Sequence, residues 1–149
     1  MDITVLAYIK KDDSYLMLLR NKKSNDMNEG KWLGVGGHVE KNETPNQALF
    51  REIKEETNLD VIDFTYRGKL TFINDEYSEI MHLYTVEKFS GEIRECDEGT
   101  LEFKKIKDIP NLNIWEGDKV FLDLIAKDEP FFELTLIYKN GELKEVKRI

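Results

Sequence analysis

The residues best suited to chemistry lie in one short stretch, Arg51-Glu52-Ile53-Lys54-Glu55-Glu56, with a further glutamate, Glu43, just before it. On a helix, where successive residues are about 100° apart, the carboxylates of Glu52, Glu55 and Glu56 share one arc beside an apolar edge. Like charges three and four residues apart repel each other, so a bound cation would relieve this arrangement. Hard divalent cations prefer such oxygen ligands, although a run of glutamates is also typical of a solvated helix face.

The spacing around these glutamates favours the cation-binding interpretation. The segment from Gly37 to Leu59, GHVEKNETPNQALFREIKEETNL, follows the pattern G-x5-E-x7-R-E-U-x-E-E-x-G-U, in which U is a bulky aliphatic residue. Every fixed position matches except one, where Asn58 stands in place of Gly. The segment resembles the signature box of the Nudix hydrolase family, and a match of this length is far more specific than a lone glycine-rich loop.

The resemblance implies a role for each matched residue. Arg51 and Glu43 would orient the loop and the helix. The magnesium ligands, with manganese as an alternative metal, would be the carbonyl of Gly37 and the carboxylates of Glu52, Glu55 and Glu56. Glu56 is the preferred central ligand, while Glu52 and Glu55 share the remaining ligand role and the role of the base that accepts a proton from the attacking water. Family members cleave a nucleoside diphosphate linked to another group, a reaction that needs charge neutralisation and a placed water.

The flanking sequence indicates a substrate class. Upstream of the box, Gly30 to Gly37 resembles the glycine-rich segment of the MutT branch of the family, whose members hydrolyse oxidised purine nucleoside triphosphates. Downstream, two tracts resemble those of the animal oxidised-purine triphosphatases, Glu95 to Gly99 and Asn113 to Asp118. Two positions depart from these relatives, because Leu33 replaces an Asn and Gly117 replaces an Asp.

The downstream resemblance makes Glu98 an additional metal-binding or water-positioning carboxylate, Trp115 a stacking surface for a purine, and Asp118 a hydrogen-bonding partner for the purine edge. Structural alternatives remain open for all three. Glu98 can be a turn residue, Trp115 a hydrophobic staple, and Asp118 the N-cap of the helix that follows. Lys23, in a basic loop with Arg20 and Lys22, is a candidate phosphate contact or a solvated loop charge.

We therefore expect a magnesium-dependent nucleoside triphosphate pyrophosphohydrolase of MutT type, with an oxidised purine nucleotide such as 8-oxo-dGTP as substrate and a monophosphate and pyrophosphate as products. The alternatives are another Nudix substrate, such as ADP-ribose, an ADP-sugar or dihydroneopterin triphosphate, and a non-catalytic nucleotide-binding regulatory module. Such modules usually lose box glutamates, whereas all four are present here.

The elements that must position these residues can be read from local patterns. Thr44, Pro45 and Gln47 form a helix start with a capping box, and the helix should run from Pro45 to Thr57. Asn58 should end it in the left-handed conformation, which Asn tolerates second only to Gly. We also expect strands at 4–9, 15–19, 64–72, 80–89 and 101–106, a glycine-rich strand or turn at 32–39, a helix at 118–126 and a C-terminal hairpin at 140–141.

These elements favour an α/β (α+β) sandwich, and their pattern alone does not separate α/β from α+β. The resemblance implies the Nudix fold, a mixed β-sheet between helices, in a single Nudix domain over residues 1–149. The 149 residues carry 22 basic and 30 acidic side chains, a net charge of −8, which makes a nucleic-acid partner unfavourable. The absence of a leader or a long apolar run predicts a cytoplasmic protein without a membrane partner. The sequence does not indicate an oligomeric state.

Overall fold

The glutamate-rich segment forms helix α1 (Pro45–Thr57), with the predicted bounds. The Thr44 hydroxyl accepts a hydrogen bond from the Gln47 backbone N–H at 3.2 Å, and the Gln47 side chain accepts one from the Thr44 N–H at 2.9 Å. Asn58 ends the helix with a left-handed φ of 70°, and its N–H donates to the carbonyl of Lys54. The capping box and the left-handed end are therefore both confirmed.

The computed structural model describes residues 1–22 and 26–149, and within these residues nine strands form one mixed sheet. The main path of the sheet is β3-β2-β1-β6-β5-β8-β9, while β4 pairs with β1 and β7 pairs with β2. The pairs β1–β6 and β5–β8 are parallel and the others are antiparallel. The strands are β1 (Asp2–Lys11), β2 (Ser14–Leu19), β3 (Trp32–Leu33), β4 (Val35–His38), β5 (Asp60–Asn74), β6 (Tyr77–Ser90), β7 (Thr100–Lys105), β8 (Phe132–Lys139) and β9 (Glu142–Arg148).

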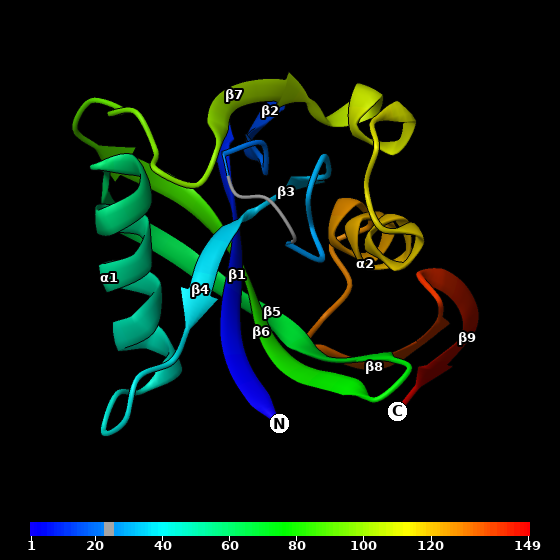
Figure 1. The fold of residues 1–149 in the computed structure, drawn as a ribbon. Helices are drawn as coiled ribbons and strands as arrows, with labels where there is room; N and C mark the ends of the chain where they lie inside the picture. The colour runs from blue at the N-terminus through cyan, green and yellow to red at the C-terminus, as the bar shows by residue number, and fades with distance from the viewer. Residues whose placement is uncertain (23–25) are drawn as a thin grey trace.

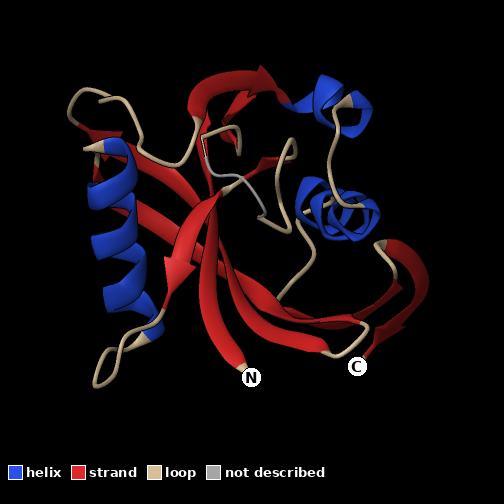
Figure 2. Cartoon of the chain, viewed as in Figure 1, coloured by secondary structure: helices blue, strands red, loops and turns tan. Residues whose placement is uncertain are grey.

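The sheet lies between two helices (Figures 1 and 2), which confirms the predicted fold class. Helix α1 buries Leu49 and Ile53 in an apolar cluster that includes Val5 and Val35 of the sheet. On the other face, helix α2 (Glu116–Ala126) buries Phe121 in a second and larger cluster. Each helix thus contributes one apolar stripe to the core and leaves its polar face to solvent.

The structure corrects several predicted boundaries. Strands β5 and β6 are longer than expected, because they form a twisted antiparallel pair that continues beyond the buried residues. A 3-10 helix, Ile106–Asn111, follows β7 and was not predicted. Helix α2 begins at Glu116 rather than Asp118, with Trp115 as its N-cap residue. The N-cap interpretation of Asp118 is therefore wrong.

Two glycines of β4 allow close approaches, one to strand β1 and one to helix α1. A Cβ atom on Gly36 would lie 1.8 Å from the Val5 carbonyl oxygen, so only glycine allows β4 to pair with β1 here. A Cβ atom on Gly37 would lie 2.5 Å from the carboxyl group of Glu52 on α1. The glycines thus let the helix place its glutamates against the strand.

Within the described ranges, no helix is long and apolar enough to cross a membrane.

Candidate active site

Glu52 and Glu56 of α1 face a cavity of about 510 Å³. Its walls come from the first residues of β1 and β6, from β4, from the end of β5 and from the start of α2. Its lining includes Glu52, Glu56 and Glu98, which interact with one another and are called the carboxylate end. It also includes Leu33 and the packed rings of Phe72 and Trp115, which are called the aromatic or apolar end. A volume of this size is typical of sites that bind small molecules.

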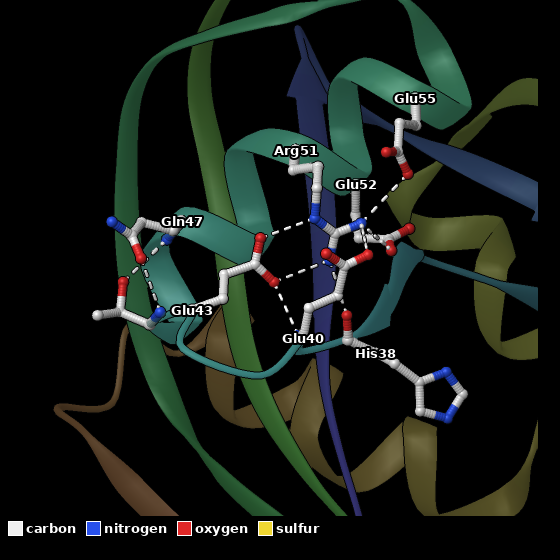
Figure 3. A network of polar contacts seen from close by, with 8 residues as sticks. His38, Glu40, Glu43, Gln47, Arg51, Glu52 and Glu55 are labelled. Carbon is white, nitrogen blue, oxygen red and sulfur yellow. Dashed lines mark hydrogen bonds and ion pairs between the residues drawn. The ribbon is translucent and has the colours of Figure 1, made fainter.

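Arg51 organises the carboxylate end (Figure 3). Its guanidinium donates two hydrogen bonds to Glu43, at 2.7 and 2.9 Å, one to the carbonyl oxygen of His38 at 2.9 Å, and one to Glu52 at 2.7 Å. The hydrogen bonds from Arg51 lower the pKa of Glu43 to about 2. Since a guanidinium fork holds carboxylates in a fixed geometry, this network ties the loop before the helix to strand β4 and orients Glu52.

Glu52, Glu56 and Glu98 all line the cavity, although Glu98 comes from a segment more than 40 residues further along the chain. The Gly36 backbone N–H donates to Glu56 at 3.3 Å. Burial, followed by the contact with Glu98 and the charge of Glu52, raises the pKa of Glu56 to about 9. Burial also raises the pKa of Glu52. Carboxyl groups this close cannot all ionise without a compensating cation.

Two candidate residues are not placed in the cavity. Glu55 does not line it, has 59% of its side chain exposed, and accepts a hydrogen bond from Arg51 at 3.2 Å. Lys23 lies outside the described residues. Of its neighbours in the basic loop, Arg20 lines the cavity and forms an ion pair with Asp26 at 2.8 Å, while Lys22 binds Glu95 at 2.7 Å.

Trp115, Phe72 and Leu33 line the apolar end of the cavity. The Trp115 ring packs edge-on against Phe72, with ring centroids 5.2 Å apart, and its Nε1 donates to the side chain of Asn28 at 2.7 Å. The Nζ atom of Lys31 lies 4.7 Å from the centre of the same ring, a cation–π contact. Trp115 is therefore both a core residue and part of the cavity wall.

Asp118 lies on the same wall, with a relative exposure of 7%. Within the described part of the chain, its carboxyl group has no hydrogen-bond or ion-pair partner, which is costly for a buried polar group. Burial raises the pKa of Asp118 to about 8, against the opposing charge of Lys31. At neutral pH the carboxyl group is therefore mostly uncharged and can donate a hydrogen bond as well as accept one.

The structure also explains one departure from the relatives. Gly117, which replaces an Asp, donates its backbone N–H to the hydroxyl of Tyr138 at 2.6 Å. A Cβ atom at this position would lie 2.6 Å from the same hydroxyl oxygen, so Tyr138 fills the space that a longer side chain would need. Leu33, which replaces an Asn, leaves its part of the cavity wall apolar.

Sequence reasoning missed a cluster of four polar side chains on the cavity wall, those of Asp2, Thr4, Tyr77 and Glu79. It also missed Asn28, which holds the indole of Trp115. These residues belong to no motif and lie in segments far apart along the chain. The alternation of Asp2, Thr4 and Leu6 on one face of β1 is a signal that could have identified part of the group.

The donor set at the carboxylate end suits a hard divalent cation, although no group of three or more His, Cys, Asp or Glu side chains is already arranged around a metal position in the described ranges. Two observations carry the fit. The carboxyl group of Glu52 occupies the space beside Gly37 that a side chain would fill, and the crowding of Glu52 and Glu98 around Glu56 is of the kind that a cation relieves.

Three comparisons with known proteins, by family model, by sequence and by structure, agree with one another. The NUDIX domain model matches residues 2–125. An oxidized purine nucleoside triphosphate hydrolase of Danio rerio is 31% identical over 116 residues, which are 76% of this chain and 74% of that protein. An uncharacterized Nudix hydrolase of Bacillus subtilis is 28% identical over 136 residues, which are 87% of this chain and 82% of that protein. Among solved structures, a MutT protein from Bacillus halodurans has a TM-score of 0.89 at 22% identity and covers 99% of this chain, with 97% of its own length matched.

Proposed function

Since the chain belongs to the Nudix family, we propose that it hydrolyses a nucleoside triphosphate to a monophosphate and pyrophosphate, with an oxidised purine nucleotide such as 8-oxo-dGTP as the preferred substrate. The chain is a Nudix hydrolase, acting on nucleoside phosphate bonds. The observation that carries the finer proposal is a single cavity that joins a carboxylate end to an aromatic end with a buried, mostly uncharged Asp118. The relative of Danio rerio is named for the same class of substrate.

Nudix hydrolases generally use divalent metal ions, and we propose magnesium, or alternatively manganese, because every candidate ligand is an oxygen. The ligands would be the Gly37 carbonyl and the carboxylates of Glu52, Glu56 and Glu98, with Glu55 completing the set. When bound, the cation supplies charge neutralisation for the phosphates and lowers the pKa of a bound water.

The chain's own residues provide positioning and proton transfer. Arg51, fixed by Glu43 and the His38 carbonyl, holds Glu52 against β4. Glu56 is the central ligand in this proposal, and Glu52 and Glu55, which both accept hydrogen bonds from Arg51, share the role of the base. The base would take the proton of the attacking water, and the Arg51 network would limit the movement of these carboxylates.

At the other end of the cavity, the packed rings of Trp115 and Phe72 would form an aromatic wall against the flat purine, and Asp118 would bind its edge. An oxidised purine presents both hydrogen-bond donors and acceptors there, and an uncharged carboxyl group can match one of each. Because Leu33 and Gly117 provide no polar side chain, Asp118 carries the edge recognition in this proposal.

The test is the release of pyrophosphate and orthophosphate from a panel of substrates, with magnesium and with a chelator. The panel contains 8-oxo-dGTP, dGTP, the other nucleoside triphosphates, ADP-ribose and dihydroneopterin triphosphate. The expected result is metal-dependent pyrophosphate release with the highest kcat/KM for 8-oxo-dGTP. A preference for ADP-ribose or the pterin would overturn the substrate proposal, and tight binding without turnover would favour a regulatory binding module.

A matched pair of variants sharpens the assay. Glu56→Gln keeps the size of the side chain but removes the charge, so turnover should fall by a large factor while the circular dichroism spectrum stays unchanged. Glu145→Gln makes the same chemical change on the exposed strand β9, outside the cavity, and should leave turnover as in the wild type. Near-wild-type activity of Glu56→Gln would refute the ligand assignment.

A further inference from the structure

A second polar region of the cavity lies apart from the α1 glutamates. In the sheet register, Asp2 on β1 lies opposite Glu79 on β6, and Glu79 lies opposite Phe72 on β5. All three side chains line the cavity. These three neighbouring positions therefore connect a pair of carboxylates to the aromatic wall of the proposed purine site.

Hydrogen bonds join the two carboxylates into one unit. The Tyr77 hydroxyl lies 3.0 Å from Asp2 Oδ2 and 2.7 Å from Glu79 Oε1, and the Thr4 hydroxyl donates to Glu79 Oε2 at 2.5 Å. Burial, followed by the contacts with Glu79 and Asp2, raises the pKa of Tyr77, so its hydroxyl stays protonated. A single phenolic proton cannot saturate two carboxylates, each of which can accept several hydrogen bonds.

The chemistry of this region selects its ligand group. Two adjacent carboxylates repel a phosphate, whereas they accept hydrogen bonds from a neutral group with neighbouring donors. Vicinal sugar hydroxyls present two donors side by side, which suits a pair of carboxylates. Asp118 supplies independent evidence that this cavity holds a ligand, because the residue is 7% exposed, lines the same cavity, and has no side-chain hydrogen bond among the described residues.

The location agrees with a sugar site. Thr4 lies opposite His38 of β4, the residue after Gly37 at the carboxylate end, and opposite Met81 of β6 on its other side. Glu79 lies opposite Phe72 at the aromatic end. The group thus stands between the region proposed for the phosphates and the region proposed for the base, which is where the ribose of a nucleotide connects the two.

We propose that Asp2 and Glu79, bridged by Tyr77, form a site for the 2′- and 3′-hydroxyls of a ribose. For the same base the enzyme therefore prefers the ribonucleotide, so that 8-oxo-GTP is a better substrate than the 8-oxo-dGTP of the substrate panel. The proposal rests on the proposed function, because it assigns the sugar within the same cavity. Loss of one charge-assisted hydrogen bond reduces binding by about tenfold or more, so a preference of that size is expected for the ribonucleotide.

The experiment compares kcat/KM for pairs that differ only in the 2′-hydroxyl, GTP with dGTP and 8-oxo-GTP with 8-oxo-dGTP. Calorimetric titration with GMP and with dGMP, in the presence of a chelator, provides a readout that needs no turnover. The variants are Glu79→Gln and Asp2→Asn. Glu79→Gln changes a residue that Thr4 and Tyr77 both contact, so this variant can disturb the fold. Asp2→Asn is the second variant because the Asp2 side chain is 46% exposed and its replacement leaves both contacts of Glu79 in place. Glu145→Gln on β9 is the control.

The expected result is a preference of about tenfold or more for the ribonucleotide in both assays, retained in Glu145→Gln and lost in Glu79→Gln and Asp2→Asn. Equal values for the two sugars in the wild type would overturn the sugar site while leaving the proposed hydrolysis intact. A preference that survives both substitutions would overturn the assignment to these carboxylates. If the wild type hydrolysed none of the four triphosphates, the proposed function would fail, and the monophosphate titration would still decide the sugar site.

Discussion

Cation binding at the carboxylate end should be coupled to the release of a proton from Glu56. With a pKa of about 9, Glu56 is ionised in about one molecule in a hundred at pH 7 when no cation is bound. A cation binds the ionised form, so each binding event at pH 7 should release about one proton. The ionised fraction of Glu56 grows about tenfold per pH unit below its pKa. The apparent affinity for the cation should therefore rise about tenfold per pH unit until about pH 9.

Isothermal titration calorimetry with magnesium, repeated in buffers of different ionisation enthalpy, measures the number of protons released. The wild type should release about one proton at pH 7. In Glu56→Gln that proton does not exist, so the number should fall by about one and the affinity should fall as well. Glu145→Gln, on exposed strand β9, should give the wild-type number.

A wild-type proton count near zero at pH 7 would refute the reasoning, because it would mean that Glu56 is already ionised before the cation binds. An unchanged count in Glu56→Gln would also refute it and would assign the released proton to another group. Since Glu98 contacts Glu56 in the cavity, Glu98→Gln then becomes the variant to measure.

Three further predictions follow from single contacts. With saturating magnesium, kcat/KM for the purine substrate should fall above about pH 8, because Asp118 loses the proton with which it donates, and Asp118→Asn should flatten this pH profile. Gly117→Ala should lower the free energy of unfolding in urea by about 1–3 kcal/mol, because its Cβ would lie 2.6 Å from the Tyr138 hydroxyl; an unchanged midpoint would contradict this packing. Asn58→Ala should cost about 1 kcal/mol in the same assay while Asn58→Gly is nearly neutral, since the left-handed φ of 70° disfavours alanine; equal effects would argue against conformational strain.

Local chemistry explains which parts of the fold were predictable. The bounds of α1 follow from Thr44, Pro45, Gln47 and Asn58, whose preferences act within a few residues. The hairpin at 140–141 follows from the Asn-Gly pair in the same way. By contrast, the start of α2 at Glu116 depends on how Trp115 packs in the core, which no local pattern specifies.

The candidate site likewise contains residues that a sequence motif identifies and residues that only long-range strand pairing brings together. The box glutamates were identified because segment 37–59 resembles the Nudix box, and Glu98 was identified by resemblance to relatives. Asp2, Tyr77 and Glu79 meet only through the β1–β6 register, which depends on long-range pairing. The metal and substrate roles, the single-domain organisation and the cytoplasmic location stay predictions.

The contact between Tyr138 and Gly117 has a consequence for how this sequence can change over time. The hydroxyl of Tyr138 occupies the space next to position 117, and it is also the acceptor for the N–H of that residue. Replacement of Gly117 alone creates a clash, and loss of the Tyr138 hydroxyl alone leaves a buried donor unpaired. The two positions should therefore vary together among descendants of this chain, with a larger residue at 117 accepted only after a smaller one at 138. The strand β8, which lies beyond the region matched by the family model, would in this way limit which base-recognition side chains the lineage can acquire.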